Sequence, residues 1–256
     1  DTTLWKSYLT KIDLNNHKIV SVGDYAFYRC EVLSDFSLSD CTSIGKYAFS
    51  SCKNFKNAEL SCSVSDHAFY ASGLTNVKFK NSIESIGDYA FAGAVSRFPV
   101  NIKEINVSVN KIGIYAFRYT ILENITLTDV EEIGEYAFSN IVAKNSEYKT
   151  TVDICGTIKK IPTGMFMNST TLERVRFPDS CTEIGELSFV LAGSHSKSTS
   201  GGIDLSLNNC SKIGENAFSG AKFKNKDLDL PSVVEIGKNA FKDGGSTKKT
   251  LIKTIT

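Results

Sequence analysis

The sequence predicts an α/β repeat solenoid, and three observations lead to this prediction. A six-residue phrase, written IGDYAF at Ile86 and IGEYAF at Ile133, recurs ten times along the chain. Its last residue recurs every 20 to 29 residues, which is the repeat length of a solenoid with one repeat per coil. An alternating apolar run precedes each phrase. The ten copies end at Phe27, Phe49, Phe69, Phe91, Phe117, Phe138, Phe166, Phe189, Phe218 and Phe241.

Each coil is expected to begin with one short strand. Apolar, polar and apolar residues alternate there, and a period of two places the apolar side chains on one face. Neighbouring strands would form a parallel sheet of ten or eleven strands. The apolar pairs are Ile12 and Leu14, Phe36 and Leu38, Ala58 and Leu60, Val77 and Phe79, Ile105 and Val107, Ile125 and Leu127, Val152 and Ile154, Val175 and Phe177, Leu205 and Leu207, and Leu228 and Leu230.

The phrase itself is expected to turn the chain. Glycine after the isoleucine tolerates a positive φ and a close backbone approach, so it suits a sharp change of direction. The alanine is small enough for one coil to lie tightly on the next, and the phenylalanine fills the interior. We expect these two residues to enter a short helical or 3₁₀ turn. One coil cannot bury enough apolar surface to fold alone, so its stability depends on its neighbours.

These coils resemble those of the BspA-type leucine-rich-repeat family, which read roughly Leu-x-x-Ile-x-Ile-Pro and then Ile-Gly-x-x-Ala-Phe-x-x-Cys. The resemblance covers residues 9–241. The family's proline survives only at Pro178 and Pro231, and its cysteine only at Cys30 and Cys52. The resemblance implies a right-handed leucine-rich-repeat superhelix of ten coils. It would have one short strand per coil in a parallel sheet, with short helical or 3₁₀ turns opposite.

The same resemblance implies a function. Members of this family are mostly surface-exposed or secreted, and several are associated with adhesion to host or bacterial proteins. We therefore expect a cell-surface or secreted recognition module whose partner is a protein on a host or neighbouring cell. The alternative is a structural spacer that presents another domain. Residues 1–256 are expected to form a single solenoid domain within a longer chain, since no signal peptide is visible at Asp1.

Composition and motifs weigh against other classes of function. A net charge of +1 gives no electrostatic argument for nucleic acid, and no apolar run approaches the length of a membrane span. The chain has no Gly-x-Ser-x-Gly elbow, phosphate loop or dinucleotide fingerprint, so we expect no enzyme. There is no Cys-x-x-Cys pair, and the three histidines lie in distant coils, so we expect no metal and no cofactor.

The seven cysteines allow two interpretations. Cys41 and Cys210 follow their strands by three residues and would pack as small buried hydrophobes, the interpretation we favour for the set. Disulfides between neighbouring coils are the alternative, because stacked coils bring equivalent Cα atoms within disulfide range. The pairs would be Cys30 with Cys52, or Cys41 with Cys62.

Two surfaces are candidates for binding. The first is the outward face of the sheet, where the interpretation as an ordinary solvated face competes with a binding role. Its candidate residues are Arg174, Arg176, Lys78, Lys80 and Asn76. The second is an aromatic ladder formed by the fourth residue of the phrase, where ring packing between coils competes with a contact strip for a protein. Its candidate residues, with His67 among them, are Tyr25, Tyr47, Tyr89, Tyr115 and Tyr136.

Overall fold

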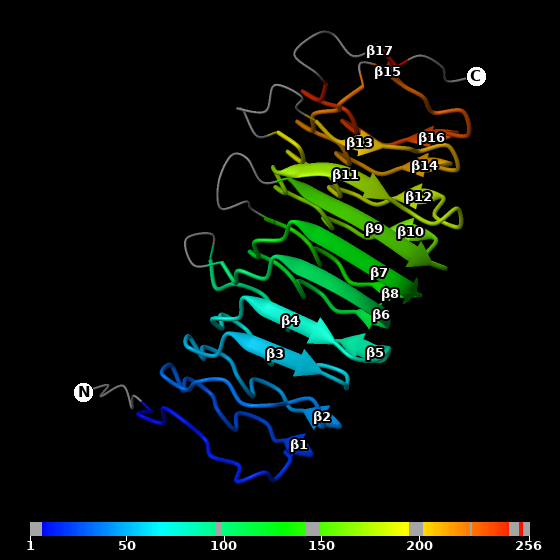
Figure 1. Ribbon diagram of the computed structural model, residues 1–256. Helices are drawn as coiled ribbons and strands as arrows, with labels where there is room; N and C mark the ends of the chain where they lie inside the picture. The colour runs from blue at the N-terminus through cyan, green and yellow to red at the C-terminus, as the bar shows by residue number, and fades with distance from the viewer. Residues whose placement is uncertain are drawn as a thin grey trace.

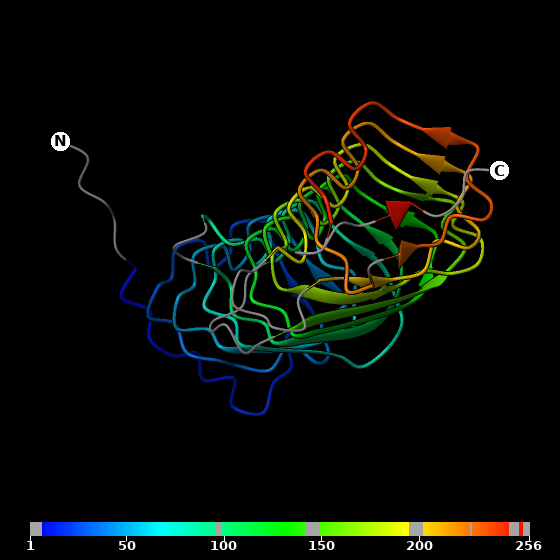
Figure 2. The same cartoon turned by 90° about the horizontal axis from the view of Figure 1, so that it is seen from above.

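The chain forms an elongated stack of turns, seen side-on in Figure 1. The computed structural model describes residues 7–95, 99–141, 149–194, 202–225, 227–245 and 251–252. It is a parallel-sheet β-solenoid of about nine turns, with the two ends of the chain at opposite ends of the stack. Ten phrases delimit nine steps from one phrase to the next, so the prediction of ten coils is not confirmed. Figure 2 looks along the stack and shows that successive coils are progressively rotated.

Most coils contain two strands, so the prediction of one strand per coil is wrong. The first strand lies on the alternating run. The second ends at the isoleucine or valine that opens the phrase. Strands of the first kind are β3 (Asn57–Leu60), β4 (Asn76–Phe79), β7 (Asn124–Val130), β9 (Thr150–Gly156), β11 (Leu172–Arg176), β13 (Asp204–Leu205), β15 (Asp227–Leu228) and β17 (Leu251–Ile252). Strands of the second kind are β1 (Ser21–Val22), β2 (Ser43–Ile44), β5 (Ile83–Ile86), β8 (Glu132–Ile133), β10 (Lys160–Ile161), β12 (Glu183–Ile184), β14 (Lys212–Ile213) and β16 (Glu235–Ile236). Strand β6 (Glu104–Ile112) spans both positions.

Strands of the second kind pair from coil to coil and form a second ladder. This ladder exists because the phrase glycine donates its N–H to the coil before it. Gly113 donates to the carbonyl of Ile86 at 2.7 Å, and Gly134 donates to that of Ile112 at 2.7 Å. Neither glycine has a positive φ. A Cβ on Gly113 would lie 2.5 Å from the backbone nitrogen of Asp88. Close approach between coils, rather than an unusual dihedral, is therefore what requires glycine here.

The ladder formed by the strands on the alternating runs begins only at β3, because the predicted strands around Leu14 and Leu38 are not formed. Between the second coil and the third, a side chain replaces the backbone ladder. The carboxylate of Asp35 accepts the backbone N–H groups of both Lys56 and Asn57. These amides are thereby satisfied without a partner strand.

The two ladders are interrupted at different places. Strand β3 pairs only with β4. A separate sheet contains, in spatial order, β5, β6, β7, β9, β11 and β13. The second ladder stops between β8 and β10. Pro162 stands there in place of the phrase glycine and has no N–H to offer Ile133. A groove of about 460 Å³ opens between residues 131–135 and 157–163. Because β7 pairs with β9 across the same boundary, the stack stays closed.

The phrase forms stacked turns, and the described residues contain no helix, so the predicted helical or 3₁₀ turn is wrong. Arg118 N–H donates within its turn to the carbonyl of Tyr115 at 3.0 Å, whereas Phe117 N–H donates to Ala137 of the next coil at 2.8 Å. Tyr115 also has φ 55°, which ends any right-handed helix. The amides thus alternate between their own turn and the next coil. In the part of the chain that the structure describes, no helix is long and apolar enough to cross a membrane.

The phenylalanines of the phrase form a continuous column inside the stack. Their ring centroids follow one another at 5.0–5.9 Å, from Phe27 to Phe241. The eight rings between these two are fully buried, and the terminal two are partly buried. The widest step, 5.9 Å between Phe138 and Phe166, coincides with the break at Pro162. The inward orientation predicted for these rings is confirmed.

Candidate functional site

The two arginines of the sheet face are engaged with carboxylates on neighbouring strands. Arg174 on β11 contacts Asp153 on β9, with 2.9 Å between Nη2 and Oδ2. Arg176 contacts Asp204 on β13 at 3.1 Å between Nη2 and Oδ2, and also donates to the Asp204 carbonyl. These pairs are half-exposed and tie neighbouring strands together. Each guanidinium therefore already has part of its hydrogen-bonding capacity occupied.

The remaining sheet-face candidates form a separate group on and just after β4. Asn76 donates to the Oδ1 of Asn57 at 3.4 Å, and the Lys80 ammonium lies 3.7 Å from Glu59. Lys78 is exposed and has no ion pair among the described residues. Strands β6, β7 and β9 separate this group from Arg174 and Arg176. The five sheet-face candidates thus lie in two clusters.

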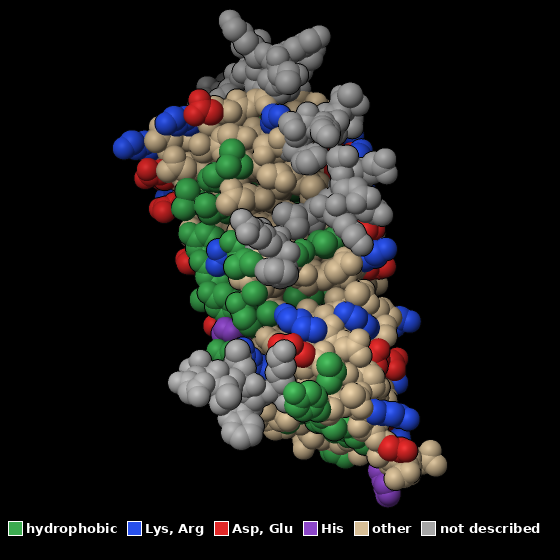
Figure 3. All heavy atoms as spheres, turned by 90° about the vertical axis from the view of Figure 1, so that its left-hand side faces the viewer, with side chains coloured by type: hydrophobic (Ala, Val, Ile, Leu, Met, Phe, Trp, Pro, Cys, Tyr) green, Lys and Arg blue, Asp and Glu red, His purple; other side chains and the backbone are tan. Residues whose placement is uncertain are grey.

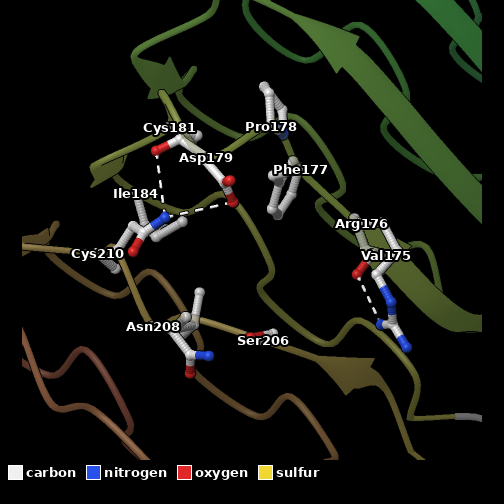
Figure 4. Close-up of a pocket in the computed structure, with 12 residues that line it drawn as sticks. Val175, Arg176, Phe177, Pro178, Asp179, Cys181, Ile184, Ser206, Asn208 and Cys210 are labelled. Atoms are coloured by element: carbon white, nitrogen blue, oxygen red, sulfur yellow. Dashed lines mark hydrogen bonds between the residues drawn. The ribbon is translucent and has the colours of Figure 1, made fainter.

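A pocket of about 300 Å³ lies beside Arg176, where β11 and β13 part (Figure 4). The two strands pair only as far as Val175 and Leu205. Beyond that point Pro178 has no N–H with which to continue a ladder. Phe177 and Pro178 line one side, while Ser206 and Asn208 lie on the facing segment.

Polar side chains and two thiols are among the residues that line the pocket. Cys181 and Cys210 come from adjacent coils. Burial raises the pKa of the Cys181 thiol to about 11 and also raises that of Cys210. Both thiols are therefore protonated at neutral pH and are poor nucleophiles. A second pocket of about 230 Å³ lies on the other side of Ser206 and Asn208. The arrangement can offer hydrogen bonds to a small polar group.

The aromatic ladder is continuous through six coils. Ring centroids lie 4.9 Å apart between Tyr25 and Tyr47 and 5.0 Å apart between Tyr115 and Tyr136. His67 continues the stack, at 4.4 Å from Tyr47 and 4.7 Å from Tyr89. The ring packing between coils expected from the sequence is therefore present. Figure 3 shows hydrophobic side chains gathered in a stripe along one edge of the molecule.

Backbone conformation explains both the register of the ladder and its end. The six ladder residues all have φ between 53° and 56°, a left-handed conformation that is rare for bulky side chains. The shared dihedral aims every ring in the same direction. The next coil has Gly164 at this position, and a Cβ added there would lie 2.0 Å from the ring of Tyr136. Because glycine has no side chain, the ring of Tyr136 folds over it and closes the ladder.

A second row of side chains packs against the ladder, and it was not predicted from the sequence. Tyr28 meets Tyr25 edge-on at 5.7 Å, and the Arg118 guanidinium lies 4.8 Å from the centroid of Tyr115. In the sequence, this row corresponds to the residue three positions after each ladder residue. The size of its side chain alternates between large and small from coil to coil. The six residues are Tyr28, Ser50, Tyr70, Ala92, Arg118 and Ser139.

Comparison with known proteins gives a family and a fold. The model for BspA type leucine rich repeat regions matches residues 5–96, 62–194 and 194–256. The chain belongs to the BspA-type leucine-rich-repeat family. Proteins of this family are typically surface-exposed or secreted. A search of curated proteins finds no match.

Two solved structures are similar to this family member. A leucine-rich repeat protein from Bacteroides ovatus ATCC 8483 superposes with a TM-score of 0.68 at 24% identity. The match covers 88% of this chain and 58% of that one, so this chain spans less than two thirds of its length. At this identity the likeness concerns the fold alone. The pneumococcal vaccine antigen PcpA gives 17% identity over 92% of this chain and 68% of that one, with a TM-score of 0.34, too low to establish a shared fold.

The cysteines of this leucine-rich-repeat chain are unbridged. Six are buried, and Cys155 is exposed. The Cys52 thiol donates to the Phe27 carbonyl at 3.0 Å, and burial raises the Cys52 pKa to about 12. Cys41 likewise donates to the carbonyl of Ile19 at 3.3 Å. Buried thiols that face backbone carbonyls agree with the packing interpretation, and the alternative disulfides are not formed.

Proposed function

We propose that this chain is a non-catalytic recognition module, displayed at a cell surface or secreted, that contacts a protein partner through the N-terminal end of its aromatic ladder. Membership of the BspA-type family supports the location. The single observation that carries the binding proposal is the exposure of the first ladder ring, Tyr25, at 55%, together with the adjacent Tyr28 at 44%. Arg29, beside them, is also exposed.

The chemistry of this cluster suits a protein interface. Tyrosine and arginine dominate the residues that contribute most to protein–protein binding energy. Stacking against Tyr47 and the edge contact with Tyr28 hold the ring of Tyr25 in one place. A rigid aromatic side chain loses little conformational entropy when a partner binds it. The ladder is therefore an ordered contact surface before any partner arrives.

The sheet face is the weaker candidate. Arg174 and Arg176 would have to loosen their contacts with Asp153 and Asp204 before they could engage a ligand strongly. Lys78 is available, but a flexible lysine loses more entropy on binding than an aromatic ring does. These contacts favour the ladder over the sheet.

Affinity capture from a surface-protein extract tests this proposal. The purified domain is compared with a Tyr25→Ser, Tyr28→Ser variant and with an Arg174→Ala, Arg176→Ala variant, after circular dichroism has shown that all three fold. We expect the tyrosine variant to lose at least ten-fold of the captured partner and the arginine variant to keep it. Loss only in the arginine variant would assign binding to the sheet face instead.

A spacer that presents another domain is the second candidate. The unbroken phenylalanine column from Phe27 to Phe241 favours it, because stacked coils joined by axial contacts make a stiff rod. Failure of all three proteins to retain any partner above background would support the spacer and count against recognition.

A further inference from the structure

Three tyrosine pairs of the ladder bring two phenol rings together, two of them stacked face to face and one tilted. The ring planes of Tyr25 and Tyr47 differ by 7° at 4.9 Å, and those of Tyr115 and Tyr136 by 13° at 5.0 Å. Tyr89 and Tyr115 are 4.9 Å apart with 31° between their planes. The ladder residues share one positive-φ backbone conformation, so neighbouring rings leave the backbone in the same direction.

We propose that these pairs are sites of oxidative cross-linking, at which a one-electron oxidant such as a peroxidase with hydrogen peroxide joins adjacent coils through dityrosine bonds. Each phenol gives up one electron and one proton. The two radicals combine through their ortho carbons to form one carbon–carbon bond. The hydrogen on each of these carbons then moves to its own oxygen and restores the aromatic ring. The two tyrosines lose two hydrogen atoms in all, and the peroxide is reduced to two molecules of water.

The fold supplies what this coupling ordinarily lacks, which is a second phenol already in place. Holding two reactants together replaces a collision between chains by a local rearrangement. The edge-to-face pair Tyr25 and Tyr28, with 75° between its planes, does not bring two ortho carbons together in this way. Coupling is therefore expected along the stack, between coils.

The pairs differ in reactivity. Tyr25 is the most exposed ladder ring, so Tyr25 and Tyr47 should react first. The positive charge of Arg118 over the ring of Tyr115 disfavours loss of an electron there. His67 separates Tyr47 from Tyr89, and no bond should form across it. The bond that does form would tie two coils covalently and restrict the unfolded chain, as a disulfide does.

The test treats the purified protein with peroxidase and hydrogen peroxide and maps linked peptides by mass spectrometry. We expect peptides joined at Tyr25 and Tyr47, lighter by two hydrogen atoms, in a yield per molecule that does not depend on protein concentration. Tyr47→Phe keeps the ring stack but lacks the phenol, so it should lose this link. His67→Tyr should add links across position 67, and the matched His67→Phe should add none.

Two outcomes would overturn the proposal. One is a wild-type protein that forms no dityrosine under conditions in which free tyrosine couples. The other is a set of links that form mainly between molecules, rise with protein concentration and persist in Tyr47→Phe.

Discussion

Individual residues determine how closely one coil can lie on the next. The phrase glycine and the ladder residue two positions later have different structural roles. Glycine permits two backbones to touch, whereas the ladder residue takes a left-handed dihedral that re-aims the chain. The same left-handed position holds Asn216 and Asn239 in the last coils, where asparagine tolerates the dihedral at lower cost than tyrosine. In the first six coils the dihedral is accompanied by ring stacking, whereas Leu187 in the eighth coil adopts it outside the aromatic ladder.

The close-approach role of glycine gives a matched pair of substitutions. Gly113→Ala would place a Cβ 2.5 Å from the backbone of Asp88 and should lower the free energy of unfolding by about 1–3 kcal/mol. Gly23→Ala lies in the first coil, where a Cβ meets nothing within 4 Å, and should be neutral. Urea denaturation followed by circular dichroism measures both. Equal effects would refute the idea that contact between coils selects glycine.

His67 makes stability depend on pH. Burial lowers its pKa below the usual value of about 6.5, helped by Lys46 and opposed by the carboxylates of Asp66 and Asp88. Below that value the unfolded chain binds a proton more readily than the folded one, so stability should fall as pH drops from 7 toward 5. His67→Tyr should show a smaller loss in thermal melts over this range. A larger loss in the variant would contradict the assignment.

At the level of strands, the ladders depend on a few backbone donors. Seven phrase glycines give their N–H to the preceding coil at 2.7–2.8 Å, and Pro162 cannot. The break in the second ladder, the widest phenylalanine step and the end of the aromatic ladder all lie at this one boundary. The pairing of β7 with β9 holds the two parts together there.

The second residue of the phrase should decide where the second ladder is interrupted. Replacing Pro162 by glycine should repair the ladder there, and replacing Gly134 by proline should break it one coil earlier. Pro162→Gly restores a donor for the carbonyl of Ile133, so the new amide at position 162 should be protected from hydrogen exchange. Gly134→Pro removes the bond to Ile112 and should lower the free energy of unfolding by more than about 1 kcal/mol. An unprotected amide in the first variant would mean that something other than the missing donor keeps the groove open.

Over the whole molecule, stability passes from coil to coil along the stack. In such a linear array a local defect weakens its neighbours more than distant coils. The boundary at Pro162 lacks the second backbone ladder, although β7 and β9 still pair across it. Damage in the N-terminal coils should therefore spread less readily past it.

Phe91→Ala tests this transmission. Phe91 is fully buried between Phe69 and Phe117, with both centroids 5.4 Å away, and its truncation should cost about 3–5 kcal/mol. Hydrogen exchange should accelerate most in the adjacent coils and least beyond Pro162. Asp204→Ala removes only the half-exposed pair with Arg176 and should lower the urea midpoint far less. Uniform acceleration along the chain would show a single cooperative unit instead.

Much of the candidate site could be predicted from the sequence. The ladder of Tyr25, Tyr47, Tyr89, Tyr115 and Tyr136 follows from one position of a repeated phrase, because equivalent residues of stacked coils must lie side by side. The ion pairs of Arg174 and Arg176 could not be predicted from the sequence. They depend on which residues face each other on neighbouring strands, and the partners are 21 and 28 residues apart in the chain. Insertions of variable length hide that register in the linear sequence.

Properties that each coil carries within itself were legible from the amino acids alone: the repeat length, the inward phenylalanine and the outward polar face. Properties that arise between coils required the three-dimensional structure. These are the second ladder, its interruption at Pro162, the stacked turns in place of helical ones, and the ion pairs of the sheet face. The reason is physical. A hydrophobic period is a local pattern, whereas the partner of a backbone N–H or a charged side chain is decided by how one coil is placed on another.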